Sequence, residues 1–98
     1  MGLRLPHRGR SCHVYMVNVS IVHTVDRTKA KSTEALRELV LANVSGTDRV
    51  QHVYVRAGPN RIEVVLFVQA INRREADITG YRVCARTCTA LPGAYPDN

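Results

Sequence analysis

Hydrophobic and polar residues alternate along three stretches of the chain, and a period of two residues is typical of β-strands. Residues 14–25 place valine, tyrosine and isoleucine on one face and a mixed set on the other. Residues 49–57 and 61–70 alternate in the same way, and they flank the sequence "GPN" at residues 58–60, whose composition favours a tight turn. We therefore expect one strand and, later in the chain, a two-stranded hairpin.

A helix is predicted between the first strand and the hairpin, over residues 32–46. Apolar side chains recur there at the helical spacing. Ser32 or Thr33 can cap the first turn by accepting hydrogen bonds from its free amides. Gly46 can adopt the left-handed conformation that commonly follows a helix, so we expect this residue to end the helix.

A second helix is predicted from about Arg73 to about Ala90. Asn72 and Glu75 form a pair that resembles a capping box, in which each side chain satisfies a backbone amide near the helix start. The glycine at position 80 costs about 1 kcal/mol in a helix relative to alanine. Its place among other small residues indicates that the helix approaches the sheet closely there.

The order strand, helix, strand, strand, helix predicts an α+β protein. It is the ferredoxin-like βαββα plan without its last strand. We expect a three-stranded antiparallel sheet with both helices on one face, the first strand pairing with the third and lying at an edge. A long apolar edge needs cover. The N-terminal arm, the C-terminal tail or another chain could supply it.

A chain of 98 residues accommodates one domain. We expect a flexible basic N-terminal arm at 1–12, a single α+β domain at 13–93 and a loose C-terminal tail at 94–98. The net charge is +6, with three arginines and no acidic residue in the arm. No apolar run is long enough to span a membrane and the N-terminus lacks the apolar core of a signal peptide, so a cytoplasmic location without membrane contact is expected.

The sheet face opposite the helices is too apolar to be simply solvated and too polar to be a second core. A contiguous patch of this kind marks an interaction surface. Ser20, Glu63 and Gln69 also lie on this face, beside the residues that are the interface candidates. Those candidates are Met16, Asn18, Val22, His52, Tyr54, Arg56, Val65 and Phe67.

The first hypothesis is therefore a small non-enzymatic binding or partner-regulating protein that associates through this face as a homodimer. A protein partner could also add a strand to the open sheet edge, which needs no special side chains.

The second hypothesis is an enzyme. The architecture resembles that of the dimeric α/β-barrel proteins, some of which are catalysts while others only bind ligands or partners. The resemblance implies that His52, Tyr54 and Glu63 could act as acid–base groups in a cavity between two sheets, on an apolar or aromatic metabolite. No catalytic residue is assigned on the sequence, and no cofactor is expected.

The third hypothesis is binding of RNA or single-stranded nucleic acid. Tyr54 and Phe67 could stack exposed bases, as aromatic residues do in RNA-recognition domains, and the basic arm could contact phosphate. The "RIEVVLFVQA" strand lacks the Lys/Arg-Gly-aromatic signature of those domains. The motif therefore gives this hypothesis no support.

Cys84 and Cys88 lie four residues apart in the second predicted helix, on one face. They are weak candidates for a metal site, because structural zinc needs about four ligands and no second pair has suitable spacing. Buried packing explains the two residues better, since free cysteine behaves as a small hydrophobic residue.

Overall fold

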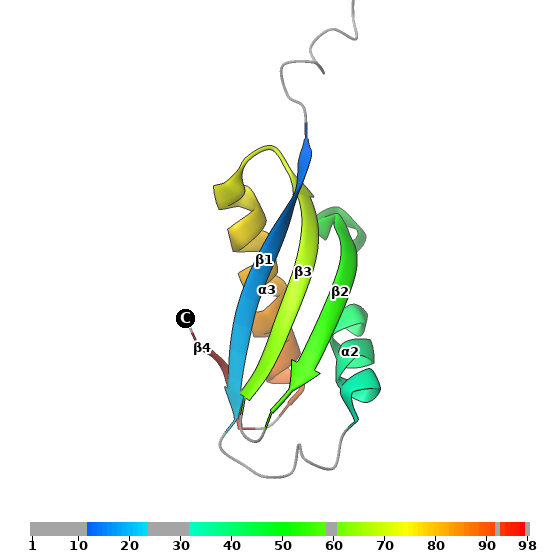
Figure 1. Ribbon diagram of the computed structural model, residues 1–98, viewed down its shortest axis with the longest axis vertical. Helices are drawn as coiled ribbons and strands as arrows, with labels where there is room; N and C mark the ends of the chain where they lie inside the picture. Colours follow the sequence, from blue (N-terminus) through cyan, green and yellow to red (C-terminus); the bar gives the residue numbers. More distant parts are fainter. Residues whose placement is uncertain (1–11, 24–31, 59–60, 92, 98) are drawn as a thin grey trace, which may run out of the picture.

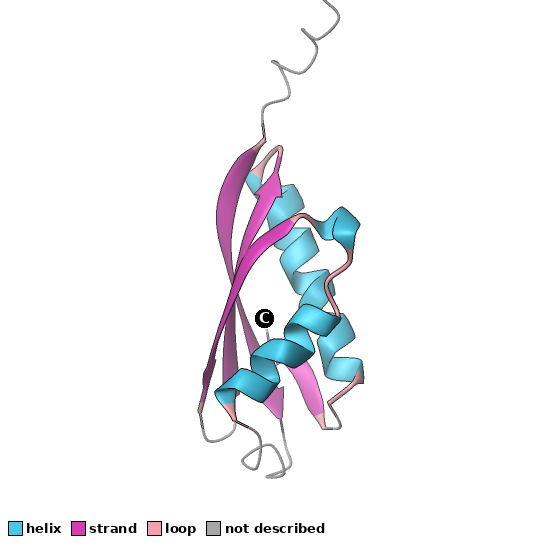
Figure 2. Ribbon diagram, turned by 90° about the vertical axis from the view of Figure 1, so that its right-hand side faces the viewer, coloured by secondary structure: helices cyan, strands magenta, loops and turns pink. Residues whose placement is uncertain are grey.

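The computed structural model describes residues 12–23, 32–58, 61–91 and 93–97. It is an α+β structure in which both α-helices cover the same face of a four-stranded antiparallel sheet (Figures 1 and 2). The elements are β1 (His13–His23), α2 (Thr33–Ala42), the 3-10 helix η2 (Gly46–Asp48), β2 (Val50–Ala57), β3 (Arg61–Ala70), α3 (Arg73–Thr89) and β4 (Ala94–Asp97).

The strand order in the sheet is β2-β3-β1-β4. The predicted antiparallel pairing of the first and third strands is confirmed, since β1 pairs with β3 along almost its whole length. The hairpin is closed by a hydrogen bond of 2.8 Å from the Gly58 amide to the Arg61 carbonyl. The remainder of its turn, residues 59 and 60, lies outside the described residues, as do most of the expected N-terminal arm (residues 1–11) and the last two residues of the predicted first strand (24 and 25).

The expected three strands and the loose C-terminal tail are both wrong. Residues Ala94–Asp97 form a fourth strand, which pairs antiparallel with residues 20–23 of β1. The segment is short and contains Pro96, which cannot donate to a strand ladder, so its sequence carries a weak strand signal. The strand is held by its surroundings. It supplies backbone partners to the edge of β1, and Asp97 forms a 2.8 Å ion pair with Arg61 on β3.

The hydrophobic core lies between the sheet and the two helices. Burial along β3 alternates strictly, with every second side chain facing the helices, as the spacing predicts. The buried apolar residues are Val17, Val19, Ile21, Leu36, Val40, Val53, Ile62, Val64, Leu66, Val68, Ala70, Ala76, Val83, Cys84, Cys88 and Leu91.

The predicted N-caps are present. Ser32 accepts a hydrogen bond from the Ala35 amide at 3.0 Å, and the Asn72 side chain accepts one from the Glu75 amide at 2.8 Å. The Glu75 carboxylate differs from the expected box in one detail, because it accepts from the Ile71 amide at 3.0 Å, one residue before the cap. Both helix starts are nevertheless set by the side chains that the sequence identifies.

The prediction that Gly46 ends the first helix is wrong. The helix α2 ends at Ala42, with Asn43 as its C-cap, and Gly46 instead begins η2. The Asn43 side chain donates to the Leu39 carbonyl at 2.9 Å, and Arg86 donates to the Asn43 carbonyl at 2.8 and 3.0 Å. Side chains therefore satisfy the carbonyl groups at this helix end, and no left-handed glycine is needed.

The close approach expected at Gly80 is confirmed. A Cβ atom added at this position would lie 2.6 Å from Cγ1 of Val17 and 3.1 Å from its Cβ. Both residues are buried, and Val17 lies on β1. The absence of a side chain at Gly80 therefore allows α3 to pack directly against the middle of the sheet.

We predict that Gly80→Ala lowers the free energy of unfolding by about 1–2 kcal/mol. The added methyl group would lie 2.6 Å from Cγ1 of Val17, so we expect an overpacking cost of about 2–3 kcal/mol, and the better helix propensity of alanine recovers about 1 kcal/mol. Urea denaturation measures the difference. Gly46→Ala is the matched control, because a Cβ there would meet nothing within 4 Å. Equal stability of the two variants would contradict the close contact.

Candidate functional site

The sheet face that points away from the helices is uncovered among the described residues, as Figure 2 shows from the side. Strand register arranges its side chains in three rows that cross β1, β3 and β2. The rows are Met16–Phe67–His52, Asn18–Val65–Tyr54 and Ser20–Glu63–Arg56. We call this surface the open face. All the interface candidates that the sequence indicates on these strands therefore lie on one surface.

Three rings form an aromatic cluster on the open face. Phe67 lies edge-on to both neighbours, with ring centroids 6.2 Å from His52 and 5.8 Å from Tyr54. The rings of His52 and Tyr54 are closer to parallel, at 26° and 6.4 Å. Edge-to-face aromatic pairs contribute about 0.5–1.5 kcal/mol beyond the area they bury. The cluster is therefore held in place before any partner arrives.

The aromatic cluster is also accessible. Tyr54 retains 57% of its surface and Met16 retains 52%, while Phe67 is half-buried between its neighbours. His52, Asn18 and Arg56 are exposed, and Val22 and Val65 are half-buried. The open face thus presents large apolar groups to solvent in a contiguous arrangement, which is the property of an interaction surface.

A polar row borders the aromatic cluster. The Ser20 hydroxyl lies 2.9 and 3.0 Å from the two carboxylate oxygens of Glu63, and it donates to them. Glu63 pairs across the strands with Arg56, whereas His52 pairs with Phe67. Four residues along a strand span roughly 13 Å. His52 and Glu63 are therefore too far apart to act as an acid–base pair within one chain.

The open face extends further than the sequence indicates. Tyr95 on β4 stands opposite Val22 on β1 and keeps 50% of its surface exposed. Val14, opposite Gln69, is 55% exposed at the other end of β1. Tyr95 was missed because its strand was missed. Its alternation with Ala94 and Pro96 is the one local signal that could have found it.

Cys84 and Cys88 are both buried, as the packing interpretation predicts, and they belong to the hydrophobic core. Burial raises the pKa of Cys84 to about 12, with a smaller contribution from the neighbouring Cys88, and burial also raises the pKa of Cys88. At neutral pH both groups are therefore protonated thiols, which are poor nucleophiles and poor metal ligands. Within the described ranges, no group of three or more His, Cys, Asp or Glu residues could hold a metal ion.

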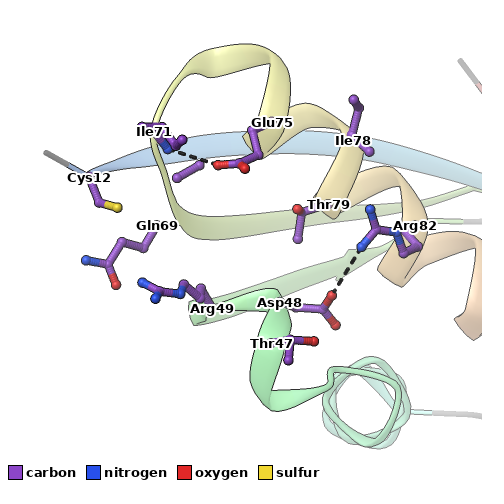
Figure 3. A pocket seen from close by; sticks show the side chains of 11 residues that line it. Cys12, Thr47, Asp48, Arg49, Gln69, Ile71, Glu75, Ile78, Thr79 and Arg82 are labelled. Carbon is purple, nitrogen blue, oxygen red and sulfur yellow. Dashed lines mark hydrogen bonds and ion pairs between the residues drawn. The ribbon is translucent and has the colours of Figure 1, made fainter. Parts of the chain in front are cut away.

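A second polar feature lies on the helix side, around the buried carboxylate of Asp48 (Figure 3). Its Oδ2 atom accepts hydrogen bonds from Arg86 at 2.6 Å and from the Ser45 amide at 2.7 Å. Its Oδ1 atom lies 3.7 Å from Nη1 of Arg82. The sequence analysis did not identify this network. The Ser45-x-x-Asp48 spacing is a capping-box pattern and is the signal that could have indicated it.

Comparison with known family models, curated proteins and solved structures gives no match to this chain. Among the described residues, no helix has the length and apolar character needed to cross a membrane. The functional proposals below therefore rest on the geometry of the open face and of the region around Asp48.

We predict that only Cys12 reacts quickly with a thiol reagent in the native protein. Cys12 is exposed, whereas the other cysteines are buried and have raised pKa values. Titration with a chromogenic disulfide at pH 8 should detect one thiol per chain before unfolding and all three afterwards. Cys12→Ser should abolish the native reaction. Rapid modification of a second thiol in the native wild-type protein would contradict the buried placement.

Proposed function

We propose that this chain is a small, non-enzymatic, cytoplasmic binding protein that forms a homodimer through its open face. The observation that carries the proposal is the aromatic cluster of His52, Tyr54 and Phe67, which is preorganised yet open to solvent. Packing of two such faces removes this apolar surface from water at about 25 cal/mol per Å². Two sheets that meet in this way would form an interior about 10 Å thick.

The charges on the open face support contact with a second copy. A two-fold axis brings the same face of both copies together, so the surface must be complementary to itself. Arg56 stands opposite Glu63 in the sheet, and Arg61 forms an ion pair with Asp97. Each positive group thus has a negative neighbour, and the face can meet its copy without burying a net charge.

The order of elements supports a ferredoxin-like description of the fold. With β4 included, the chain runs βαββαβ, and the strand order β2-β3-β1-β4 is compatible with that plan. Sheet-to-sheet dimers of such units are the arrangement that the resemblance to dimeric α/β-barrel proteins implies. The proposed homodimer is therefore consistent with the architecture as well as with the surface.

The aromatic geometry favours a protein contact over the nucleic-acid hypothesis. The Phe67 ring is nearly perpendicular to both neighbouring rings, with interplanar angles of 83° and 80°. Base stacking needs ring faces that are parallel and free. The Glu63 carboxylate on the same face would also repel phosphate.

A second candidate function is the dimeric-barrel enzyme that acts on an apolar or aromatic metabolite. The observation that favours it is an open hollow of about 550 Å³ on the open face, lined by Asn18, Tyr54, Val55, Arg56, Glu63 and Val65. A second copy packed above it would enclose this space. A structure of the dimer distinguishes the two functions, because a tightly packed interface contradicts the enzyme.

Edge pairing with another protein is compatible with both functions. The strand β4 covers only residues 20–23 of β1, so residues 13–19 have no strand partner on that edge among the described parts of the chain. A peptide could extend the sheet there through backbone hydrogen bonds.

We predict that the protein has the mass of a dimer in solution. Light scattering on protein purified free of nucleic acid should give the same mass at low and at high salt, because apolar burial is not weakened by screening. A monomer at all concentrations would contradict the homodimer. A dimer that dissociates at high salt would indicate an electrostatic interface elsewhere on the molecule.

We predict that Phe67→Asp weakens the dimer by roughly 30-fold or more without unfolding the monomer. Removal of a central aromatic anchor and introduction of an unpaired charge typically cost at least about 2 kcal/mol at an interface. Sedimentation and circular dichroism measure the association and the fold. Tyr81→Asp is the matched control, since Tyr81 is 44% exposed on α3, outside the open face. Equal association of both variants and the wild type would contradict the proposed interface.

A further inference from the structure

A hollow of about 550 Å³ lies where β3 leads into α3, beside η2 (Figure 3). Residues from four separate parts of the chain line it: Cys12 precedes β1, Arg49 follows η2, Gln69 is near the end of β3, and Thr79 and Arg82 come from α3. Its main walls are η2 and α3 on the helix side, and Gln69 is the one lining residue that also belongs to the open face.

The hydroxyl group of Thr79 is the first sign of a ligand. Thr79 as a residue retains only 8% of its surface, and its hydroxyl makes no hydrogen bond with any described residue. The oxygen atom itself is accessible, because no fully buried side-chain oxygen or nitrogen among the described residues lacks a partner. Thr87, two turns later in the same helix, is also buried but donates to the Val83 carbonyl at 2.9 Å. Since Thr79 lines the hollow and its hydroxyl is accessible and has no protein partner, that hydroxyl is a donor available to a ligand there.

Two arginines beside the hollow carry positive charge that acidic residues of the described chain neutralise only in part. Arg49 makes no side-chain hydrogen bond or ion pair within the described parts of the chain, although its backbone holds a left-handed conformation with φ of 54°. Such a conformation is costly for a residue other than glycine. Arg82 lies a long 3.7 Å from Asp48 and is 53% exposed.

The two acidic groups beside the hollow are already satisfied. Asp48 is held by Arg86 at 2.6 Å and by the Ser45 amide, and Glu75 accepts from the Ile71 amide at 3.0 Å. Counting Arg49, Arg82 and Arg86 against Asp48 and Glu75 leaves one positive charge. The surroundings therefore suit a ligand with a single negative charge and disfavour a dianion such as phosphate.

The remaining wall is aliphatic. Ile71 and Ile78 line the hollow and are 45% and 49% exposed, and no aromatic side chain is among its lining residues. Exposed aliphatic groups at the rim of a polar hollow can cover the apolar part of a ligand. A planar carboxylate also matches the fork of hydrogen-bond donors on an arginine.

We propose that this hollow binds a small monocarboxylate with a short aliphatic body. Arg49 and Arg82 bind the carboxylate, the Thr79 hydroxyl donates to it, and Ile71 and Ile78 contact the aliphatic part. The site stands independently of the homodimer, so the failure of either proposal leaves the other unaffected.

The test uses isovalerate as the probe on the full chain, with isovaleramide and inorganic phosphate as comparison ligands. A ligand of this size is expected to bind with a dissociation constant on the order of 1 mM. Nuclear magnetic resonance titration should place the shift changes at residues 49, 79 and 82. Isovalerate should bind at least about tenfold more tightly than either comparison ligand. Equal binding of the neutral amide or of phosphate, or shift changes elsewhere, would overturn the proposal.

Two variants separate binding from folding. Thr79→Val should weaken isovalerate binding by about tenfold with no loss of thermal stability, because no protein hydrogen bond is removed. Arg49→Asn should weaken it by a similar factor, and asparagine tolerates the left-handed backbone. The matched control is Arg74→Gln, which removes an exposed charge from α3 outside the hollow. Unchanged binding in Thr79→Val and Arg49→Asn, or equal loss in Arg74→Gln, would overturn the proposal.

Discussion

The close packing of α3 against β1 is the contact on which the rest of the structure depends. Gly80 brings the helix backbone onto Val17, and the neighbouring turns then bury Ala76, Val83 and Cys84 against the sheet. A larger residue at position 80 would lift the helix and open the core along its length. The same position of α3 leads the chain to the edge of β1, where the residues after the helix can pair as β4.

The Asp48 carboxylate is a second contact that connects the helices α2 and α3. It caps η2 through the Ser45 amide and binds Arg86 of α3, which also donates to the last turn of α2. One buried acid thus links η2 with α3 and, through Arg86, with the C-terminal end of α2. Because a buried charge is tolerated only when it is fully hydrogen-bonded, this network fixes the relative position of the helices and shapes the hollow beside it.

Much of the fold could be predicted from the sequence where a single local pattern decides the structure. The alternation in β3, the Asn72 cap and the small residue at Gly80 are of this kind, and each lies within one element. The two predictions that were wrong, the end of α2 and the number of strands, concern residues whose partners are distant in the sequence. The end of α2 depends on Arg86, and β4 depends on the exposed edge of β1.

The open face and the hollow also differ in how far local sequence patterns predict their residues. The open face follows from alternation within three strands, so most of its residues could be named in advance. Val14 at the start of β1 and Tyr95 on the missed strand were absent from the list. The hollow is lined by residues from four separate segments, and the available hydroxyl of Thr79 is visible only once its neighbours are placed. A periodic pattern cannot show that a donor lacks a partner.

Pro96 in β4 has a consequence for how copies of the protein can assemble. A four-residue edge strand with a proline at its centre offers few amides to an incoming strand, and such edges resist the stacking that leads to fibrils. Growth through sheet edges is open-ended, whereas contact between two equivalent faces is complete after two copies. A short edge strand that contains proline, beside an apolar sheet face, thus favours a small closed assembly over an unlimited polymer.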